Sequence, residues 1–242
     1  KQYLKFTKII MVNNQTQYKN VIVDKPWGYE YLAYENEHVG LWFLHINKDH
    51  QTSLHCHPKK DTGLIVLDGT VDVSFLNDIN RLVAGRKIMI RKGLFHSTKA
   101  LSNGGANIFE IETPKMKHDL VRLEDKYGRK AKPYEGKSSE KEKNRECIFF
   151  KDPAFDKKDT YIFSNCKIFV ESVSSSKTFF NISDHENIMF LNGGIMADQE
   201  GILVASPGDV IAAHIVKRLL GTFDRVHPKT VIMIIKSLDA KI

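Results

Sequence analysis

Short runs of β-branched, aromatic and aliphatic residues, separated by turn-forming residues, restrict the fold of this chain more than any other feature. Closely spaced strands of this kind are typical of antiparallel sandwiches and barrels. In the first half they predict strands at residues 29–34, 40–46, 52–57, 63–67, 70–76, 86–90 and 106–112. In the second half they predict strands at residues 160–163, 167–172, 178–182, 187–191, 201–205, 209–213 and 230–235. The sequence therefore predicts an all-β protein.

A polar stretch between the two halves indicates how the chain is organised. Residues 137–149 begin with almost no apolar side chains, so they are interpreted as an exposed linker. This gives a first β unit over residues 1–136 and a second over residues 150–242. The mixed apolar and charged spacing of residues 117–127 predicts a short helix, which Gly128 ends.

The two units share a sequence pattern that predicts a duplicated barrel. Residues 62–69 and residues 186–193 each consist of a polar residue, an apolar strand and a turn with glycine. Farther along the chain, Gly85 and Gly201 occupy corresponding places. Because two matches occur in the same order, we expect the second unit to be a diverged copy of the first.

The composition excludes several classes of protein. No apolar run reaches the roughly 18–20 residues of a membrane span, and the first residues lack the apolar core of a signal peptide. The cysteines, Cys56, Cys147 and Cys166, are odd in number and irregularly spaced, which favours a reducing, cytoplasmic location over a disulfide framework. The formal charge of +7 comes from scattered basic residues. This pattern lacks the basic helix of a nucleic-acid binder and suits a lysine-rich surface or a small anionic partner.

Three histidines carry the strongest indication of chemistry. His55 and His57 are two residues apart on a predicted strand, so their side chains point to the same face. His96, on a later strand, can complete a set of three imidazoles. Three nitrogen ligands with open positions are typical of catalytic metal sites, whereas four protein ligands usually close a structural site. The sequence therefore predicts one divalent transition metal, Zn, Mn, Ni or Fe, bound by these histidines.

The spacing around these histidines resembles the two sequence motifs of the cupin superfamily. Two residues depart from the motifs, because Thr62 stands where the first has glutamate and Arg91 where the second has proline. The first motif is matched by His55, His57 and Gly69, and the second by Gly85, Gly93 and His96.

Within the cupins, the closer resemblance is to the cupin domain of type II mannose-6-phosphate isomerases. It covers about residues 23–129 and rests on an opening segment, Lys-Pro-Trp-Gly at residues 25–28, and a closing segment, DLVRLEDKYGR at residues 119–129. The resemblance implies a double-stranded β-helix (jelly-roll) barrel, a divalent metal in its mouth and a sugar-phosphate or nucleotide-sugar ligand. Those isomerases commonly carry glutamine at the position of His55.

Other side chains near the motifs are candidates for substrate binding and catalysis. Arg86 and Arg91 flank the second motif and offer forked donors to a phosphate group, and Lys60 follows the histidine strand. His45 lies near the same strands and is the candidate catalytic base, with a hydrogen-bonded wall histidine as the alternative.

The second unit lacks the metal motif. Phe179 and Asn181 align with the paired histidines, Ala212 lies near the third position, and of the four ligand positions only Glu186 keeps a ligand-type residue. We therefore expect no metal there. The second unit would instead cover a face of the first barrel or form the interface of a homodimer.

Three functions are consistent with this pattern. The first is a metal-dependent isomerase or epimerase of a sugar phosphate or nucleotide sugar. The second is a three-histidine iron dioxygenase, since a neutral ligand set with open positions suits oxygen chemistry. The third is a non-catalytic module that binds a sugar or another small molecule. The identity of the bound metal separates them.

Overall fold

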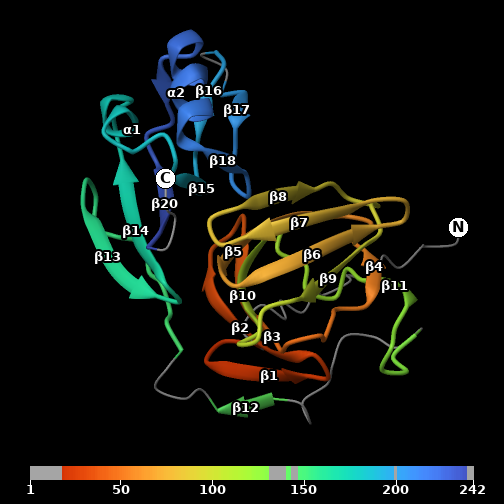
Figure 1. The fold of residues 1–242 in the computed structure, drawn as a ribbon. Coiled ribbons are helices and arrows are strands. Elements are labelled where there is room, and N and C mark those ends of the chain that lie inside the picture. The colour runs from red at the N-terminus through yellow and green to blue at the C-terminus, as the bar shows by residue number, and fades with distance from the viewer. Residues whose placement is uncertain (1–17, 131–139, 143–146, 199–200, 239–242) are drawn as a thin grey trace, which may run out of the picture.

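The structure, a computed structural model, describes residues 18–130, 140–142, 147–198 and 201–238. Nearly all regular structure in these ranges is antiparallel strand, so the predicted all-β class is confirmed. Figure 1 shows a barrel formed by the first half and a smaller unit, formed by the second half, that lies against one side of it. None of the helices in the described part of the chain is long and apolar enough to cross a membrane.

The first unit is a barrel of two facing sheets. Its strands are β1 (Val21–Lys25), β2 (Gly28–Glu35), β3 (Gly40–Ile46), β4 (Leu54–Cys56), β5 (Asp61–Asp68), β6 (Thr70–Phe75), β7 (Ile79–Val83), β8 (Lys87–Ile90), β9 (His96–Ala100), β10 (Ala106–Thr113), β11 (Val121–Glu124) and β12 (Glu140–Glu142). The larger sheet has the order β12-β1-β2-β3-β10-β5-β8, and the smaller has the order β11-β4-β9-β6-β7. The chain passes repeatedly from one antiparallel sheet to the other, which is the arrangement of the expected double-stranded β-helix.

The second unit also has a larger and a smaller sheet. Its elements are β13 (Lys158–Phe163), β14 (Cys166–Val173), α1 (Lys177–Phe180), β15 (Asn187–Asn192), β16 (Ile195–Met196), β17 (Leu203–Ala205), β18 (Val210–Ala212), α2 (Ala213–Thr222), β19 (Arg225–Val226) and β20 (Thr230–Ser237). The larger sheet has the order β13-β14-β20-β15-β18, and the smaller has the order β17-β16-β19. The first of these orders repeats β2-β3-β10-β5-β8 of the first unit strand for strand.

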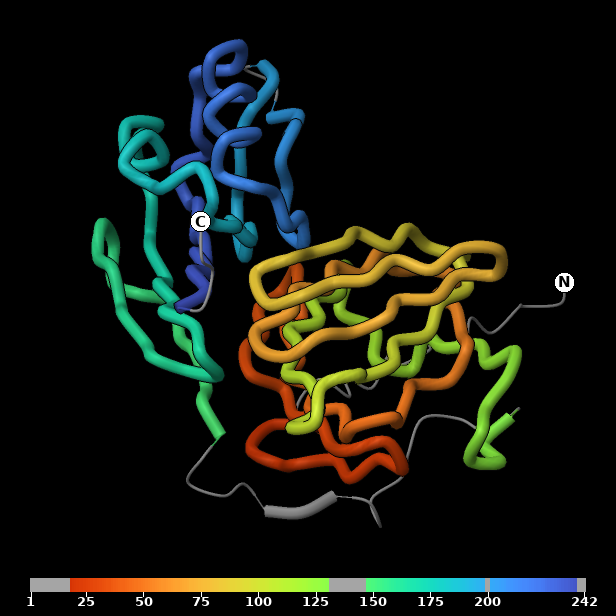
Figure 2. The backbone as a smooth tube through the Cα atoms, viewed as in Figure 1, coloured from red at the N-terminus to blue at the C-terminus, as the bar shows by residue number. Residues whose placement is uncertain are grey.

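The larger sheets of the two units pack against each other through their outer faces. One cluster of buried side chains contains Leu41, Phe43 and Ile65 from the first unit together with Met189 and Ile235 from the second. Figures 1 and 2 show the second unit lying against this side of the barrel. The inner faces of the same strands are buried in their own units. Burial on both faces explains why these strands are uninterrupted apolar runs in the sequence.

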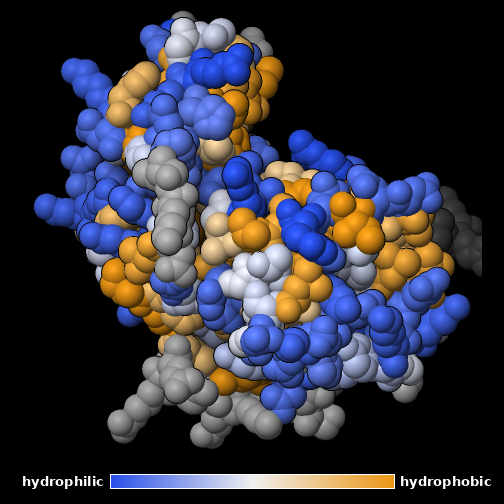
Figure 3. Space-filling model, viewed as in Figure 1, coloured by the Kyte–Doolittle hydropathy of each residue, from blue (hydrophilic) through white to orange (hydrophobic). Residues whose placement is uncertain are grey.

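The two faces of the first barrel's strands differ in what they contact. Trp42, Leu64 and Ile108 point into the barrel and form a separate core there. The smaller sheet, in contrast, turns its outer face to the surface, where Ile79 and Val83 of β7 are exposed. Figure 3 shows apolar patches among polar side chains on this face. Whether a histidine can contribute to a metal site inside the barrel therefore depends on which face of its strand it occupies.

Two predictions of local structure are wrong. Residues 117–127 do not form a helix: Val121–Glu124 is β11, which pairs with the edge of β4. Val121 and Leu123 are exposed, so the apolar residues of this segment do not make the buried stripe of a helix. Residues 178–182, predicted as a strand, instead contain most of the single-turn helix α1, because periodicity cannot assign so short an apolar run.

The predicted linker, residues 137–149, lies mostly outside the described residues. Its described part includes the strand Glu140–Glu142, whose backbone pairs with β1 at the edge of the larger sheet. Just after the linker, the backbone N–H of Phe150 donates to the carbonyl of Ala33 at 2.8 Å, and its ring joins the core shared by the two units. The chain is therefore held to the first barrel on both sides of residues 143–146.

Candidate metal centre

Three histidine rings converge inside the first barrel. His55 lies on β4, His57 follows that strand, and His96 begins β9, where it is the register partner of His55. Their candidate ligand atoms all lie within 4.8 Å of one another. The ring centroids are 4.5 Å apart for His55 and His96, 4.9 Å for His55 and His57, and 5.4 Å for His57 and His96. The structure thus brings together the three histidines predicted as ligands.

Each ring is oriented by a backbone carbonyl group that its Nδ1 contacts. The Nδ1–oxygen distances are 2.7 Å from His55 to Ser53, 2.6 Å from His57 to Asp119 and 3.0 Å from His96 to Leu94. Because a carbonyl oxygen can only accept, each Nδ1 carries the proton and donates it. The Nε2 atom of each ring then keeps its lone pair, which is the tautomer that a metal ligand requires.

Burial keeps the three imidazoles neutral. Their exposed fractions are 8% for His55, 5% for His57 and 2% for His96. Burial lowers the pKa of His96 to about 4, and it also lowers the pKa values of His55 and His57 well below their usual range. The positive charge of Lys60 contributes to each of these shifts. Neutral imidazole is the form that binds a metal ion, so the site needs no deprotonation near neutral pH.

The donor set fits a borderline divalent metal ion. Nε2 of His57 is buried and has no hydrogen-bond partner, an arrangement that native proteins seldom leave without a ligand, ion or water. Of the four predicted ions, three neutral nitrogens suit Zn, Ni and Fe best, because Mn prefers oxygen ligands. Within the described residues, no other group of three histidine, cysteine or acidic side chains comes together in this way. We therefore assign His55, His57 and His96 as the residues that would hold the ion.

Thr62 lies beside these histidines in sequence and faces the same interior. It precedes the inward-facing Leu64 by two positions on β5, so its side chain points into the barrel. The residue is 1% exposed, and its Oγ1 atom has no hydrogen-bond partner. A longer acidic side chain at this position would extend into the barrel interior.

Replacement of Thr62 by glutamate is expected to strengthen metal binding. A carboxylate would add a charged oxygen ligand to three neutral nitrogens, and Coulomb attraction is strong in a buried site, so affinity should rise about tenfold or more. The gain should be larger for Mn than for Zn, because Mn prefers oxygen ligands. Competition with a chelator measures the affinity, and Thr62→Gln provides a control of equal size without charge. A folded Thr62→Glu protein that binds metal no better than the control would show that this side chain does not reach the ion.

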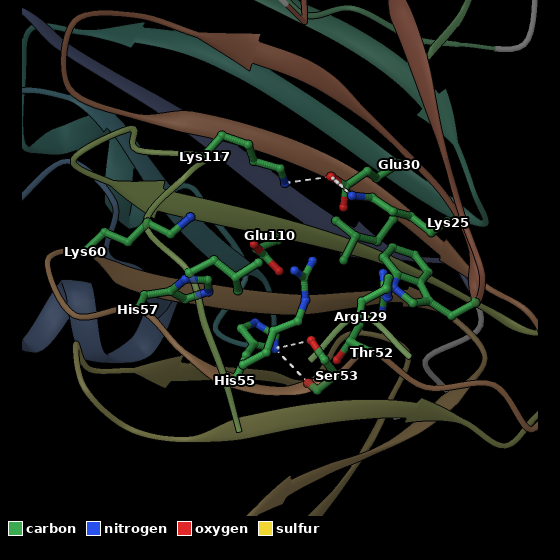
Figure 4. Close-up of a pocket in the computed structure, with 14 residues that line it drawn as sticks. Lys25, Glu30, Thr52, Ser53, His55, His57, Lys60, Glu110, Lys117 and Arg129 are labelled. Atoms are coloured by element: carbon green, nitrogen blue, oxygen red, sulfur yellow. Dashed lines mark hydrogen bonds and ion pairs between the residues drawn. The ribbon is translucent and has the colours of Figure 1, made fainter. Parts of the chain in front are cut away.

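His55 and His57 form one wall of a pocket whose other walls are rich in cations. Five basic residues line the pocket against two acidic ones, in a cavity of about 50 Å³. This volume holds a metal ion with a few water molecules or substrate atoms. Figure 4 shows most of these side chains around the histidine pair. The charged lining consists of Lys25, Lys60, Lys117, Arg122, Arg129, Glu30 and Glu110.

Buried ion pairs fix three of the lysines at the pocket wall. Glu30 lies 3.3 Å from the ammonium group of Lys25 and 2.8 Å from that of Lys117. Lys60, 1% exposed, pairs with Glu112 on β10. Removing one member of such a pair leaves an uncompensated buried charge. The lysines therefore contribute both to the rigidity of the wall and to its positive potential.

Glu110 is the acidic residue of the pocket that is suited to acid–base chemistry. It lies on the inward face of β10, two residues from Glu112, and lines the same pocket as His55 and His57. Burial raises the pKa of its carboxyl group, while the charges of Lys117 and Lys60 act in the opposite direction. A carboxyl group with a raised pKa beside a metal-type site is typical of a general acid or base.

The predicted substrate-binding residues are not all at this pocket. Lys60 lines it. Arg91 is exposed and contacts Asp61 at 3.2 Å, outside the pocket lining. Arg86 is exposed and lies just before β8. Ile90, at the other end of that strand, is the residue that pairs with Thr62. The structure therefore does not bring Arg86 and Arg91 to the metal centre.

His45, the predicted base, lies on the wrong face of its strand. It follows the inward-facing Leu44 on β3, so it points out of the barrel. Its Nδ1 is 2.7 Å from Oδ1 of Asn107, and its ring stacks on that of Tyr29 at 5.3 Å. The prediction is therefore corrected: His45 is a hydrogen-bonded wall residue, and Glu110 takes the place of the acid–base candidate.

Arg122 and Arg129 are pocket residues that the sequence did not single out. Arg122 lies on β11 as the register partner of His55, and Arg129 is held by Asp125 at 2.7 Å. Both belong to the closing segment 119–129, and the same segment provides the carbonyl group that orients His57. Their place in the closing segment is the sequence feature that points to them. Because this segment was predicted to be a helix, its pairing with β4 was not expected.

Comparisons with solved structures give likenesses of limited extent. KdgF from Halomonas sp. has a TM-score of 0.37 and 16% identity, over 39% of this chain and 88% of that one. A cupin-2 domain containing protein from Shewanella frigidimarina has a TM-score of 0.33 and 23% identity, over 37% and 83%. DMSP lyase DddQ from Ruegeria pomeroyi has a TM-score of 0.36 and 13% identity, over 39% and 50%. No protein-family model and no curated protein matches the sequence.

Proposed function

We propose that this chain is a metal-dependent isomerase or epimerase of a small phosphorylated sugar. The observation that carries the proposal is one pocket in which two histidines of the three-histidine cluster, a carboxyl group with raised pKa and an excess of cations meet.

The reaction class follows from what these groups can do. When bound, a divalent ion at the three histidines supplies Lewis-acid polarisation of a substrate carbonyl or of two neighbouring hydroxyl groups. A carboxylate oxygen of Glu110 would take the proton from the carbon beside that carbonyl. Isomerisation requires the same carboxyl group to return the proton to the neighbouring carbon, while the hydroxyl proton passes to the former carbonyl oxygen. Epimerisation would require a second proton donor on the opposite face of the first carbon.

The cationic lining supports an anionic substrate. Arg122 offers planar, forked donors that match phosphate oxygens, whereas a lysine offers a point charge. The Nε and Nη2 groups of Arg129 donate to Asp125, so this residue adds positive charge to the lining. The surplus of positive charge also attracts anions to the pocket before contact. These groups would bind the phosphate and leave the carbonyl end of the sugar toward the histidines.

A second candidate function is a three-histidine iron dioxygenase. The observation that favours it is the neutral donor set, because Thr62 stands at the position where a carboxylate would complete the site. Iron in the purified protein together with oxygen uptake would support this reading. Zinc, manganese or nickel, with binding of sugar phosphates, would support the isomerase, and a protein that binds no metal would leave a small-molecule-binding module.

The direct test of the proposal is proton exchange on candidate substrates. Metal-loaded protein is incubated in deuterated water with a panel of aldose and ketose phosphates, and deuterium at carbon is followed by NMR. Incorporation of deuterium with conversion between isomers is expected for at least one phosphate. A metal-loaded, folded protein that exchanges no carbon-bound proton across the panel would contradict the isomerase.

Replacement of Arg122 by glutamine is expected to weaken the binding of phosphorylated sugars by about tenfold or more. A hydrogen bond to a charged group contributes roughly 1.5–3 kcal/mol, which is lost with the guanidinium. Titration calorimetry or thermal shift with sugar phosphates measures the change. Arg86→Gln is the matched control, since Arg86 lies away from the pocket. An equal loss in both variants, or equal binding of neutral sugars at this pocket, would count against an anionic substrate.

A further inference from the structure

The second unit contains a pocket at the place that corresponds to the metal pocket of the first. The two units can be aligned without reference to sequence similarity, from backbone hydrogen bonds alone. Val66 on β5 and Phe190 on β15 each receive a hydrogen bond at their carbonyl from a glycine N–H, and each donates to the carbonyl of the residue after that glycine. These glycines, Gly85 and Gly208, both have positive φ. Gly208, and not Gly201 as the sequence suggested, is therefore the counterpart of Gly85.

From this anchor the register of the sheets identifies equivalent positions. The row that crosses the first sheet through Val66 corresponds to the row that crosses the second through Phe190. Likewise, the next row of the first sheet, through Leu64, corresponds to the row of the second sheet through Ile188. In the first unit the rows are Glu30-Leu44-Ile108-Val66 and Leu32-Trp42-Glu110-Leu64, and in the second they are Lys158-Glu171-Ile232-Phe190 and Thr160-Phe169-Ile234-Ile188.

Three lining residues of the second pocket occupy positions that line the first. Lys158, Glu171 and Ile234 stand where Glu30, Leu44 and Glu110 stand in the first unit. Asn181 precedes Glu186 by five residues, as His57 precedes Thr62, and both Asn181 and Glu186 line the second pocket. The volume of this second pocket is about 260 Å³, far larger than that of the first.

The chemistry of the second pocket differs from that of the first. In the described residues it has no metal-type cluster, because Phe179, aligned with His55, is buried in the core, and helix α2 follows β18 where a strand with the third histidine would come. Its lining holds one lysine and two glutamates: Lys158 lies 3.2 Å from Glu171, and Glu186 lies 3.6 Å from Lys236, which is outside the lining. A pocket without an excess of cations does not select an anion.

The polar groups of the second pocket suit hydroxyl groups. The buried Oε2 atom of Glu171 accepts no hydrogen bond, although it lies within ion-pair distance of Lys158. The side chains of Glu186, Asn181 and Thr178 add acceptors and donors at the rim. The ring of Phe169 lines the same space, with the ammonium group of Lys158 at 4.4 Å from its centroid. Acceptors and donors around an aromatic ring match a molecule with hydroxyl groups on an apolar carbon frame.

We propose that the pocket of the second unit is a metal-independent binding site for an uncharged, polyhydroxylated ligand, a neutral sugar or a cyclic polyol. This site is separate from the metal centre and does not depend on the function proposed for it. The second unit, on this view, recognises a ligand and does more than cover the first barrel.

Saturation-transfer NMR on the full chain tests the site with mannose, glucose, galactose and inositol as probes. Transfer to at least one probe is expected, unchanged by a chelator and unchanged in His57→Ala. Glu186→Gln and Asn181→Leu should each weaken it about tenfold or more, because each loses hydrogen bonds to the ligand. Asp184→Asn, at an exposed acidic residue outside the pocket, is the matched control and should bind as the parent does.

Three outcomes would overturn the proposal. They are no transfer to any neutral probe, transfer that disappears with the chelator or in His57→Ala, and transfer that survives both pocket substitutions. Asn181 is exposed, so its replacement leaves the core intact and keeps the test valid if Glu186→Gln is unstable.

Discussion

Replacing His57 by alanine is expected to remove metal from the protein. Among the described residues, three nitrogens form the ligand set, and the rings are held in place by carbonyl groups, so the remaining pair cannot close around the ion. Loss of a mere supporting contact costs about 10–100-fold in affinity, and loss of a ligand should exceed that range. Elemental analysis of protein purified without a histidine tag should give about one ion per chain for the parent and a trace for the variant.

His50→Ala is the matched control for this experiment. His50 is exposed, and its Nδ1 atom contacts the nearby carbonyl group of Lys48. The control should keep the metal content of the parent. Equal metal in His57→Ala and the parent, with both proteins folded, would mean that the ion is bound elsewhere or that the histidines serve only to hydrogen-bond.

Replacing Glu110 by glutamine is expected to reduce turnover by about 10²–10⁴-fold while metal content stays the same. The amide has nearly the same shape but cannot take a proton from carbon. The raised pKa of Glu110 fixes the direction of the pH dependence, since the carboxylate acts as a base only when ionised. The rate of the parent should therefore rise with pH through a value above that of an ordinary glutamate, and the variant should lack this limb.

Exchange of carbon-bound protons for deuterium is the measurement that isolates this step. Glu124→Gln, at an exposed glutamate on β11, is the matched control and should exchange as the parent does. A Glu110→Gln protein with the exchange rate of the parent would remove Glu110 from the chemistry. A variant that has lost both metal and exchange would show instead that Glu110 supports the metal centre.

The histidine pair could be predicted from short-range geometry, and His96 from its place in the second sequence motif. Alternation along a strand places His55 and His57 on one face, and a neighbouring strand brings His96 to the same place. The same alternation indicates where Glu110 lies. In the segment Ile108–Glu112, carboxyl groups alternate with apolar side chains. Glu110 is two residues from the core residue Ile108, so both side chains lie on the inner face of the strand.

Other parts of the site could not be predicted, because they depend on which strand pairs with which. Arg122 enters the pocket only because residues 121–124 join the edge of β4, and an isolated segment of this composition gives no sign of that choice. In the sequence His45 is a candidate because it lies near the strands of the motifs, whereas its position on β3 places its side chain outward. The second unit shows the same limit, since its repeat was recognised at residues 186–193 but placed out of register at Gly201.

The core shared by the two larger sheets has a consequence for how the protein comes apart. Neither sheet can be uncovered without exposing a broad apolar surface, since Phe43 and Ile65 on one side meet Met189 and Ile235 on the other. We expect the two halves to melt in a single cooperative transition rather than in two. A polypeptide cut between the halves should stay associated, and each half made alone should aggregate through the uncovered face. Co-expression of the halves as separate chains would then restore a soluble protein that neither half gives alone.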